Sequence, residues 1–586
     1  MSVKEIVTLQ IGHFSNFVGT HLWNIQESSF IYDPASASEK EVNHDVLYRE
    51  GQNQRRQITF TPRLVASDLK GSLKTLKQQG ELYDTGTEGE EILWPGDVTM
   101  HTEEAAGKNA FLMGLDGGWS QTGSSDRHIK NESDDDDDDD KDDIEALKEK
   151  KKSEHHTQVK PSPVLGKHLN SFDDQVTVWS DFLGSHFHPK SVHVVEEYKH
   201  QDELSAFDLF PLGESVLKNY ETNCDWEDRL HFFTEECDNL QGFHVLMDTH
   251  DGFGGLGTGL LKYIEDEFPG KGVLTFGFTP SGLPDDTPAA RATRIINSAL
   301  SYEAASSHSS LFVPASLAKG LWRVLEGPHM FPSLNYKSIP YHTSAILASA
   351  IDTMSLPYRL DTGAINLRDI THSFNLQGRK LGALNTSLPL SIFQDESLID
   401  FLAQYTDDLN SCPWQTLTPH LKGVNPPFAQ SVVLRGIKPS QVPSTSDLQK
   451  LPHFLAGLTN REEVMRNFLG EKFAGSPFAV NCLNSPMKTS IPFPHIFSDK
   501  LTKTGYVSRA KRPDDCGVES VPMMTSLQST PELGTLIDSL YQAASKINMK
   551  KHHKYLACGM EEDDYAETLS SLMALRQCYS AHNEAI

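Results

Sequence analysis

The sequence predicts an α/β protein with a doubly wound, Rossmann-like parallel sheet in its N-terminal domain, then a central helix, a second α/β domain and C-terminal helices. Three observations predict this class. An apolar run at 243–247, a glycine cluster, a helical pattern and a second apolar run at 273–278 form one βαβ unit. Another strand-to-helix turn lies at 5–23. Residues 341–354 are apolar nearly all round at helical spacing, which is typical of a buried helix.

The first elements follow from local patterns. Residues 5–11 alternate between apolar and polar side chains, which predicts a strand that ends at Gly12. A helix is expected to start directly after that glycine and to include Trp23. Residues 58–66 predict a further strand, and a short helix is expected at 72–77 after a loop.

The later elements are mostly helices. They are expected over four ranges: 216–233, 289–307, 532–548 and 563–580. The third of these has a helix-start signal, because Pro531 precedes an acidic first turn that begins at Glu532. Residues 429–436 predict a strand of the second α/β domain.

We divide the chain into six parts. They are 1–121 and 166–340 (two parts of the first domain), 122–165 (an insertion), 341–356 (the central helix), 357–520 (the second, intermediate domain) and 521–586 (the C-terminal helices). The insertion contains the unbroken aspartate run 134–140 and almost no large apolar residues. It cannot bury enough surface to offset its ordering entropy, so we expect disorder. A solvated insertion and a contact for a basic partner are the two interpretations of the aspartate run.

Composition excludes several classes of protein. The net charge is −28, with 80 acidic and 52 basic residues, which argues against direct nucleic-acid binding. The seven cysteines are scattered without a CxxC pair, which argues against a disulfide scaffold and against a zinc site. His186, His188 and His193 lie close in sequence but lack a matching carboxylate or cysteine set, so we expect a loop.

The sequence contains no obvious membrane or targeting segment. No window of about 18 apolar residues exists, so no transmembrane helix is expected and any membrane association should be peripheral. The N-terminus carries Glu5 and lacks a long apolar core, so it is expected to be a strand and not a signal peptide.

The glycine cluster predicts a phosphate site. Its glycines are Gly252, Gly254, Gly255, Gly257 and Gly259. Glycines allow the backbone to approach a ligand, and the start of the following helix offers free N–H groups and a positive dipole end. The spacing matches neither the Walker P-loop nor the dinucleotide fingerprint. A tight turn that binds no ligand is the alternative.

Six parts of the chain, in the correct order, resemble tubulins. They are GHFSNFVGTHLW (12–23), PRLVASDLKG (62–71), CDNLQGF (237–243), FGGLGTG (253–259), NSALS (297–301) and, counted together as one, VLRG (433–436) with the C-terminal YLACGMEEDDYAE (555–567). The His13-Phe14 pair, the lengthened approach at 248–252 and the acidic insertion depart from ordinary tubulins. With these departures the chain resembles the Misato family of divergent tubulin/FtsZ-like proteins, which implies a tubulin/FtsZ-like fold.

The Misato resemblance also implies a function. It implies a non-motor regulatory or scaffold role in mitochondrial distribution, morphology and network (fusion) maintenance, in which guanine nucleotide is bound without efficient hydrolysis. It implies a location in the cytoplasm and, peripherally, at the mitochondrial outer membrane, with protein partners there or in the cytoskeleton. Two alternatives stay open: an active polymerising GTPase of the tubulin/FtsZ type, and a purely structural interaction protein with an empty nucleotide site.

The tubulin resemblance implies a GTP or GDP site. Its candidate residues are Gly12, His13, Asn16, Asp68, Lys70, Gly254, Gly255, Gly257, Thr258, Gly259 and Asn297. Thr258 stands where a serine usually contacts phosphate, and its hydroxyl can do the same. Phe253 adds bulk where a glycine is usual. The central helix lacks the asparagine that reads the purine, and Ser344 or His342 is the nearest replacement.

The metal support of that site is altered. His13 replaces a neutral amide; it could donate to phosphate but is a poor Mg²⁺ ligand, and a packing or surface histidine is the alternative. Lys70 stands where a glutamate is usual. It either neutralises phosphate, marks a loop that has lost its metal ligand, or is an exposed lysine. Asp68 is the one weak metal candidate, and Mg²⁺ binding stays open.

The catalytic acid is displaced. Residues 363–369 match the tubulin GxxNxD loop, but Arg368 occupies the acid's position and Asp369 comes one residue late. One residue rotates a helical side chain by about 100°. An arginine cannot orient or deprotonate water as a carboxylate does. Polymer-coupled hydrolysis is therefore expected to be lost or very weak, with Asp369 as the only weak catalytic candidate.

Overall fold

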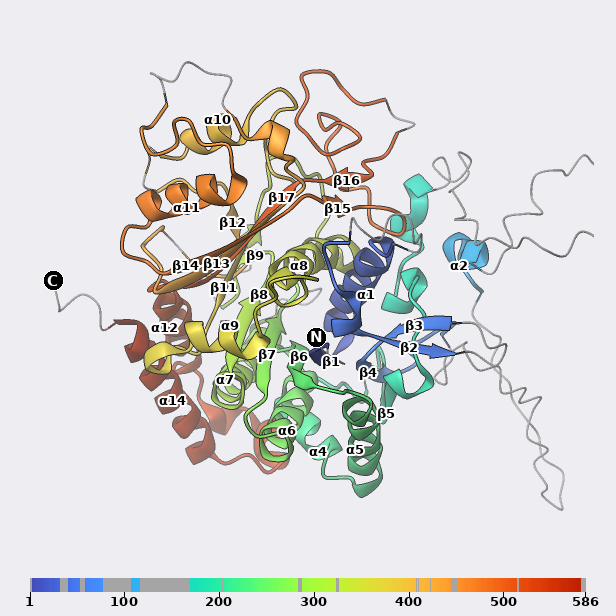
Figure 1. Cartoon of the computed structure of the whole chain (residues 1–586). Coiled ribbons are helices and arrows are strands. Elements are labelled where there is room, and N and C mark those ends of the chain that lie inside the picture. Colours follow the sequence, from blue (N-terminus) through green and yellow to red (C-terminus); the bar gives the residue numbers. More distant parts are fainter. Residues whose placement is uncertain are drawn as a thin grey trace, which may run out of the picture.

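A parallel sheet of six strands forms the first domain of the computed structural model (Figure 1). The strand order is β5-β4-β1-β6-β7-β8, and every neighbouring pair is parallel. The strands are β1 Glu5–Ile11, β4 Leu64–Lys70, β5 Val192–Lys199, β6 Leu240–Asp248, β7 Gly272–Phe278 and β8 Leu311–Ala315. The expected α/β fold with a parallel N-terminal sheet is confirmed.

The structure describes most of the chain outside the insertion. The described residues are 3–31, 40–52, 58–76, 107–115, 169–202, 204–282, 287–322, 326–406, 408, 410–421, 423–443, 451–513 and 516–580. The expected disorder of 122–165 lies outside them. Within these ranges no helix has the length and apolar character needed to cross a lipid bilayer.

Helices cover both faces of the first sheet, which suits a parallel sheet whose strands are buried on both sides. They are α1 His13–Ser28, α4 Phe210–Val216, α5 Tyr220–Glu235, α6 Gly252–Glu267, α7 Pro288–His308, α8 Pro340–Met354 and α9 Leu367–Phe374. The short helix α2 Ala110–Leu115 has no buried residue and contacts the segment Trp179–Phe182 instead of the sheet. Because strand side chains alternate, Ile6 packs with α1 and α8, whereas Val7 and Leu9 pack with α5, α6 and α7.

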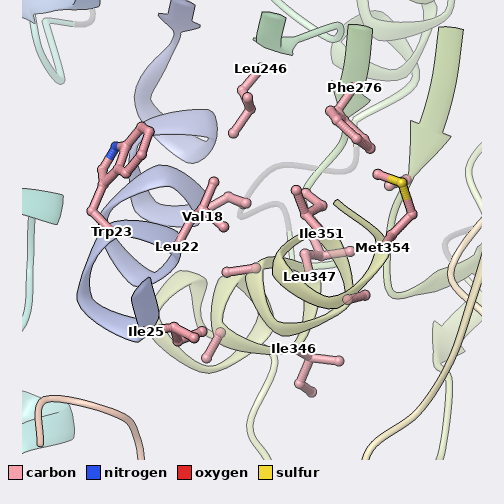
Figure 2. Packing of buried hydrophobic residues seen from close by; sticks show 14 of the residues in the cluster. Val18, Leu22, Trp23, Ile25, Leu246, Phe276, Ile346, Leu347, Ile351 and Met354 are labelled. Atoms are coloured by element: carbon pink, nitrogen blue, oxygen red, sulfur yellow. The ribbon is translucent and has the colours of Figure 1, made fainter. Parts of the chain in front are cut away.

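Helix α8 is the expected central helix, and all of its residues from Tyr341 to Met354 are buried. Figure 2 shows its apolar side chains facing those of α1, with Leu246 and Phe276 of the sheet above them. The helix also contacts strands of the second sheet. Fully burying one such aliphatic side chain contributes about 1.5–3 kcal/mol, so this contact joins the two domains through a common core.

The second sheet has five strands in the order β12-β11-β17-β13-β14. They are β11 Ala383–Ser387, β12 Gln415–Thr416, β13 Ala429–Arg435, β14 Phe478–Leu483 and β17 Met523–Ser529. Only the β13–β14 pair is parallel. The helices α10 Leu398–Ala403 and α11 Arg461–Lys472 pack with this sheet. Strand β17 follows residue 520, so the sheet takes its central strand from the C-terminal part of the chain.

The remaining elements are short or C-terminal. Three two-stranded sheets are β2 Tyr48–Gln52 with β3 Ile58–Pro62, β9 Ala318–Gly320 with β10 Glu326–Pro328, and β15 Met487–Lys488 with β16 Ser520–Val521. The C-terminal helices are α12 Leu533–Ala544, α13 His553–Ala557 and α14 Glu562–Ser580. Helices α12 and α14 pack on each other and on α7 at the side of the first domain (Figure 1).

Most predicted elements are present, and three differ. The strand predicted at 58–66 forms two strands, β3 and β4, because the extended pairing is interrupted at Arg63. The guanidinium of Arg63 donates to the carbonyls of Asp45 and Tyr48. The described part of 72–77 is turns and not helix. The helix predicted at 216–233 starts only at Tyr220, where the Asn219 side chain accepts a hydrogen bond from the first turn.

A buried ion-pair network fixes the end of α8 to the second sheet. The carboxylate of Asp352 accepts from Arg359 Nη1 at 2.9 Å and from Arg435 Nη1 of β13 at 2.8 Å. Burial alone would raise the pKa of Asp352, but the two guanidinium groups outweigh it and lower the pKa below its usual value. The carboxylate therefore stays ionised inside the protein.

We predict that Asp352→Asn lowers the free energy of unfolding by about 3–5 kcal/mol, because it leaves two buried guanidinium groups without a counter-charge. Urea unfolding at neutral pH measures this. The exposed Asp361→Asn is the matched control and should change little. Since the folded pKa of Asp352 is lowered, its contribution is present above the unfolded pKa of about 3.9 and is lost as the pH falls through the folded pKa.

Candidate nucleotide-type site at the carboxyl edge of the first sheet

The carboxyl ends of three neighbouring strands bring the candidate residues together. Ile11 of β1 aligns with Ser67 of β4 and with Met247 of β6. The next residues along these strands, Gly12, Asp68 and Asp248, therefore follow at the same level of the sheet. In open α/β sheets this edge is where ligands bind.

The side chain of Asp248 accepts hydrogen bonds from the free amides at the N-terminus of α1. Its Oδ2 accepts from the amide of Phe14 at 2.9 Å, and its Oδ1 accepts from the amide of Ser15 at 2.8 Å. Gly12 has φ +120°, and a Cβ placed on it would lie 2.5 Å from Asp248 Oδ2. Free amides at a helix start are an anion site, and here the acceptor of these amides is a side chain of the same protein.

The glycine cluster lies within a helix and not in an open loop. Helix α6 begins at Gly252, and the Asp251 side chain caps it by accepting from the Phe253 amide at 3.0 Å. A Cβ on Gly255 would lie 1.9 Å from the carbonyl oxygen of Phe210 in α4. The glycine therefore allows α6 and α4 to pack closely. Protein interiors are packed as densely as crystals of small organic molecules, so there is little room for an added side chain.

The other glycines of the cluster are packed in the same way. A Cβ on Gly254 would lie 2.2 Å from Ser301 Oγ, and one on Gly257 would lie 2.8 Å from the methyl group of Met247. Gly259 faces Leu217 at 2.5 Å by the same measure. The Thr258 hydroxyl also binds within the helix, because its Oγ1 donates to the Gly254 carbonyl at 2.8 Å.

The Asn297 side chain makes all of its hydrogen bonds with other groups of the protein. Its Oδ1 accepts from the Phe210 amide at 2.9 Å and from the Tyr555 hydroxyl at 2.6 Å. Its Nδ2 donates to the carbonyls of Asp208 and His250 at 2.7 and 2.9 Å. These contacts hold α4 and α13 against α7. An asparagine amide offers two donors and two acceptor lone pairs, so all four are used.

Asn16 and Lys70 have different surroundings. Asn16 Nδ2 donates to the Ser67 carbonyl at 2.9 Å, while its buried Oδ1 has no partner among the described residues. Lys70 Nζ lies 3.2 Å from Glu196 Oε2, and both side chains are about 60% exposed, at 62% and 61%. Such an exposed pair contributes at most about 1 kcal/mol.

Asp68 and His13 form a buried pair. His13 Nδ1 lies 2.9 Å from Asp68 Oδ2, which also accepts from Trp179 Nε1 at 2.7 Å. Burial raises the pKa of Asp68, but the charge and hydrogen bond of His13, together with the Leu69 amide, outweigh it, so the pKa lies below its usual value. His200 lies beside them, with its ring centroid 4.1 Å from that of His13.

The site is acidic as a whole. Burial raises the pKa of Asp248 well above its usual value, and the charge of Asp251 raises it further. Burial likewise raises the pKa of Asp251, against the opposing influence of His250. Three carboxyl groups, counting Asp68, therefore share one edge of the sheet. Their mutual repulsion would extend to the phosphates of a nucleotide.

The acid loop lies elsewhere in the same chain. Arg368 and Asp369 are exposed in the first turn of α9, and Asp369 accepts from Asn366 Nδ2 at 2.7 Å. The Leu367 amide donates to Gln241 at the start of β6. This is the amino edge of the sheet, so the fold does not bring Arg368 or Asp369 to the Gly12 edge.

The proposed purine-reading and histidine positions bind protein groups. His342 Nε2 lies 2.9 Å from Asp173 Oδ1, and the Ser344 hydroxyl donates to the Pro340 carbonyl at 2.5 Å. His193 pairs with Ser67 Oγ, and His188 accepts from the Lys190 amide. The predicted loop histidines thus form no common cluster within the described residues.

Three residues of this edge were not predicted from the sequence: Asp248, Asp251 and His200. A usable signal existed for the first two, because an acid directly follows an apolar strand and another immediately precedes a helix start. For His200 the signal was weaker, since only the spatial order β5-β4-β1 brings it beside Asp68.

Comparisons with known proteins match this description. A family model described as Misato Segment II tubulin-like domain matches residues 4–117, and one described as Tubulin domain matches residues 169–360. Protein misato homolog 1 of Danio rerio is 35% identical over 98% of this chain and 97% of its own length. The Homo sapiens protein of that name is 34% identical over 100% of this chain and 99% of its own. Protein misato of Drosophila melanogaster is 29% identical over 98% of both.

The relatives cover the whole fold, including both sheets and the C-terminal helices. The expected resemblance is therefore confirmed: this chain belongs to the Misato family of tubulin-like proteins.

Proposed function

We propose that this tubulin-like protein is a non-motor scaffold that acts in mitochondrial distribution, morphology and network (fusion) maintenance. The Misato-family resemblance implies this role. In this proposal the protein works in the cytoplasm and, peripherally, on the mitochondrial outer membrane. Its partners are proteins of that membrane or of the cytoskeleton, and it binds no nucleic acid directly.

We further propose that the scaffold works without turning over GTP. One observation carries this: the Asp248 carboxylate already occupies the amides of Phe14 and Ser15, where a phosphate would bind in a tubulin-type site. A nucleotide would have to displace a buried, doubly hydrogen-bonded side chain. It would also bring phosphates toward Asp68 and Asp251, which disfavours binding on electrostatic grounds.

The position of α9 supports the same proposal. In a tubulin-type polymer the acid of this loop acts on the nucleotide of the neighbouring subunit. Here Arg368 stands at the position of that acid. Asp369 comes one residue later, and its carboxylate accepts a hydrogen bond from Asn366. A cation cannot serve as the base that positions an attacking water.

Binding of GTP or GDP without hydrolysis is the second candidate. The buried Oδ1 of Asn16 favours it, because this atom has no partner among the described residues and a ligand hydroxyl could satisfy it. In that case Asp248 would leave α1, and Asp68 would be the nearest carboxylate for Mg²⁺.

Nucleotide content separates the two candidates. The native full-length protein is denatured after purification and the released nucleotide is measured by chromatography. We expect clearly substoichiometric nucleotide and no phosphate release from added GTP. Stoichiometric GTP or GDP without phosphate release would support the second candidate. GTP turnover that is lost in Asp369→Ala would instead establish the polymerising GTPase that the sequence left open.

The mitochondrial role is tested by depletion and rescue. Cells that lack the protein are expected to show a collapsed or fragmented mitochondrial network by fluorescence microscopy, and the wild-type chain should restore it. The exposed-site variants Arg368→Ala and Asp369→Ala should rescue equally well, because no hydrolysis is required. A normal network after complete depletion would contradict the role, and failure of folded Asp369→Ala to rescue would contradict a turnover-free mechanism.

The packing role of the glycines is tested separately. Gly255→Ala places a methyl group against the Phe210 carbonyl, and we expect it to lower the free energy of unfolding by about 1–3 kcal/mol. Gly470→Ala in α11 is the matched control, because nothing lies closer than 4.0 Å to its Cβ position. It should be neutral or stabilise by up to about 1 kcal/mol. Equal effects of both changes in urea unfolding would contradict the packing role.

A further inference from the structure

Three potential metal ligands converge at the outer side of the same sheet edge. His13 is the first residue of α1, Asp68 lies near the end of β4, and His200 directly follows β5. The strand order β5-β4-β1 places these three positions next to one another. One ligand atom of each residue lies within 4.8 Å of the others, and this is the one such group among the residues that the structure describes.

The fold holds each of these side chains in place. The Asp68 carboxylate is 1% exposed and accepts from Trp179 Nε1 and from the Leu69 amide, at 2.7 and 2.8 Å. The His200 amide donates to the Lys70 carbonyl at 2.9 Å, which continues the β4–β5 pairing by one residue. The His13 ring packs edge-on against Phe17. Ligands on rigid elements need little reorganisation when a metal binds.

One ring nitrogen of this group lacks a partner. His200 Nε2 is shielded from solvent and accepts or donates no hydrogen bond within the described residues. Its ring lies 4.1 Å from the His13 ring, so two imidazole groups face each other beside a carboxylate. A buried polar atom without a partner is destabilising unless a ligand or ion satisfies it.

We propose that His13, Asp68 and His200 bind one divalent transition-metal ion of the zinc type. Two imidazole nitrogens and one carboxylate oxygen suit zinc, whereas Mg²⁺ prefers oxygen ligands throughout. Bonds of about 2.0–2.2 Å in a tetrahedron place ligand atoms about 3.4 Å apart. The 2.9 Å between His13 Nδ1 and Asp68 Oδ2 and the 4.8 Å limit of the group bracket this value.

Solvent or a partner protein can supply the fourth ligand. The His13 side chain is 24% exposed, so water or a carboxylate from a partner can reach an ion held beside it. Binding replaces the hydrogen bond between His13 and Asp68 with two metal bonds. The Nδ1 proton of a neutral His13 ring moves to Nε2, whereas an imidazolium releases one proton to solvent. The ion would also offset the negative charge of Asp68. This site uses no cysteine, so the scattered cysteines that argued against zinc do not bear on it.

The proposal is tested on the full-length protein, stripped with a chelator and free of added nucleotide. Titration with ZnCl₂ by calorimetry should show one equivalent bound by the wild type. His200→Ala should weaken this binding by at least about tenfold. His329→Ala is the matched control, because that histidine also has a buried ring nitrogen without a partner but lies outside the cluster. It should leave the affinity unchanged.

Two further readouts keep the test decisive if a variant is less stable. Zinc should raise the melting temperature of the wild type and of His329→Ala, but not that of His200→Ala. Co²⁺ bound in place of zinc should show visible bands without thiolate charge transfer. Equal zinc affinity of the wild type and His200→Ala, absence of binding, or a thiolate band from any of the seven cysteines would overturn the proposal.

Discussion

The hydrogen bonds from the first turn of α1 to Asp248 set the arrangement of the first domain. A parallel sheet leaves its strand ends and helix starts at one edge, and the helix amides there need an acceptor. In this chain the acceptor comes from the end of β6, at 2.9 and 2.8 Å. The contact fixes the β1–α1 turn to the β6–α6 turn, and it requires a glycine at position 12.

The rest of the fold builds on the position of α1. Helix α1 packs against α8, and α8 in turn supports the second sheet through apolar contacts and through Asp352, Arg359 and Arg435. The same helix presents His13 to Asp68 and His200. A single buried carboxylate at the sheet edge therefore orients both the domain core and the metal-binding group that we propose.

Periodic patterns made the fold predictable from sequence. The βαβ unit, the helices near 289–307 and 563–580 and the buried central helix follow from runs of apolar residues whose spacing matches one kind of element. The structure of the glycine cluster could not be predicted from its residues, because a phosphate-binding loop and a closely packed helix both require glycine. Contacts such as that of Gly255 with Phe210 decide between them, and these depend on where α4 lies.

The surroundings of the candidate residues could not be predicted from the sequence. Motif order singled out Gly12, Asp68 and Asn297, but their hydrogen-bond partners come from other elements. Asn297 is saturated by α4 and α13, and the imidazole of His200 arrives from β5. Neither relation leaves a pattern within a short window of sequence, since both depend on the three-dimensional order of strands and helices.

The central claim is that the chain's own carboxylate holds the anion position of a tubulin-type site. An experimental structure of the full-length protein, determined with saturating GTP and Mg²⁺, tests it most directly. The account predicts Asp248 within hydrogen-bond distance of the Phe14 and Ser15 amides, as in the present structure. Phosphate oxygens on those two amides, with the Asp248 side chain turned away, would contradict it.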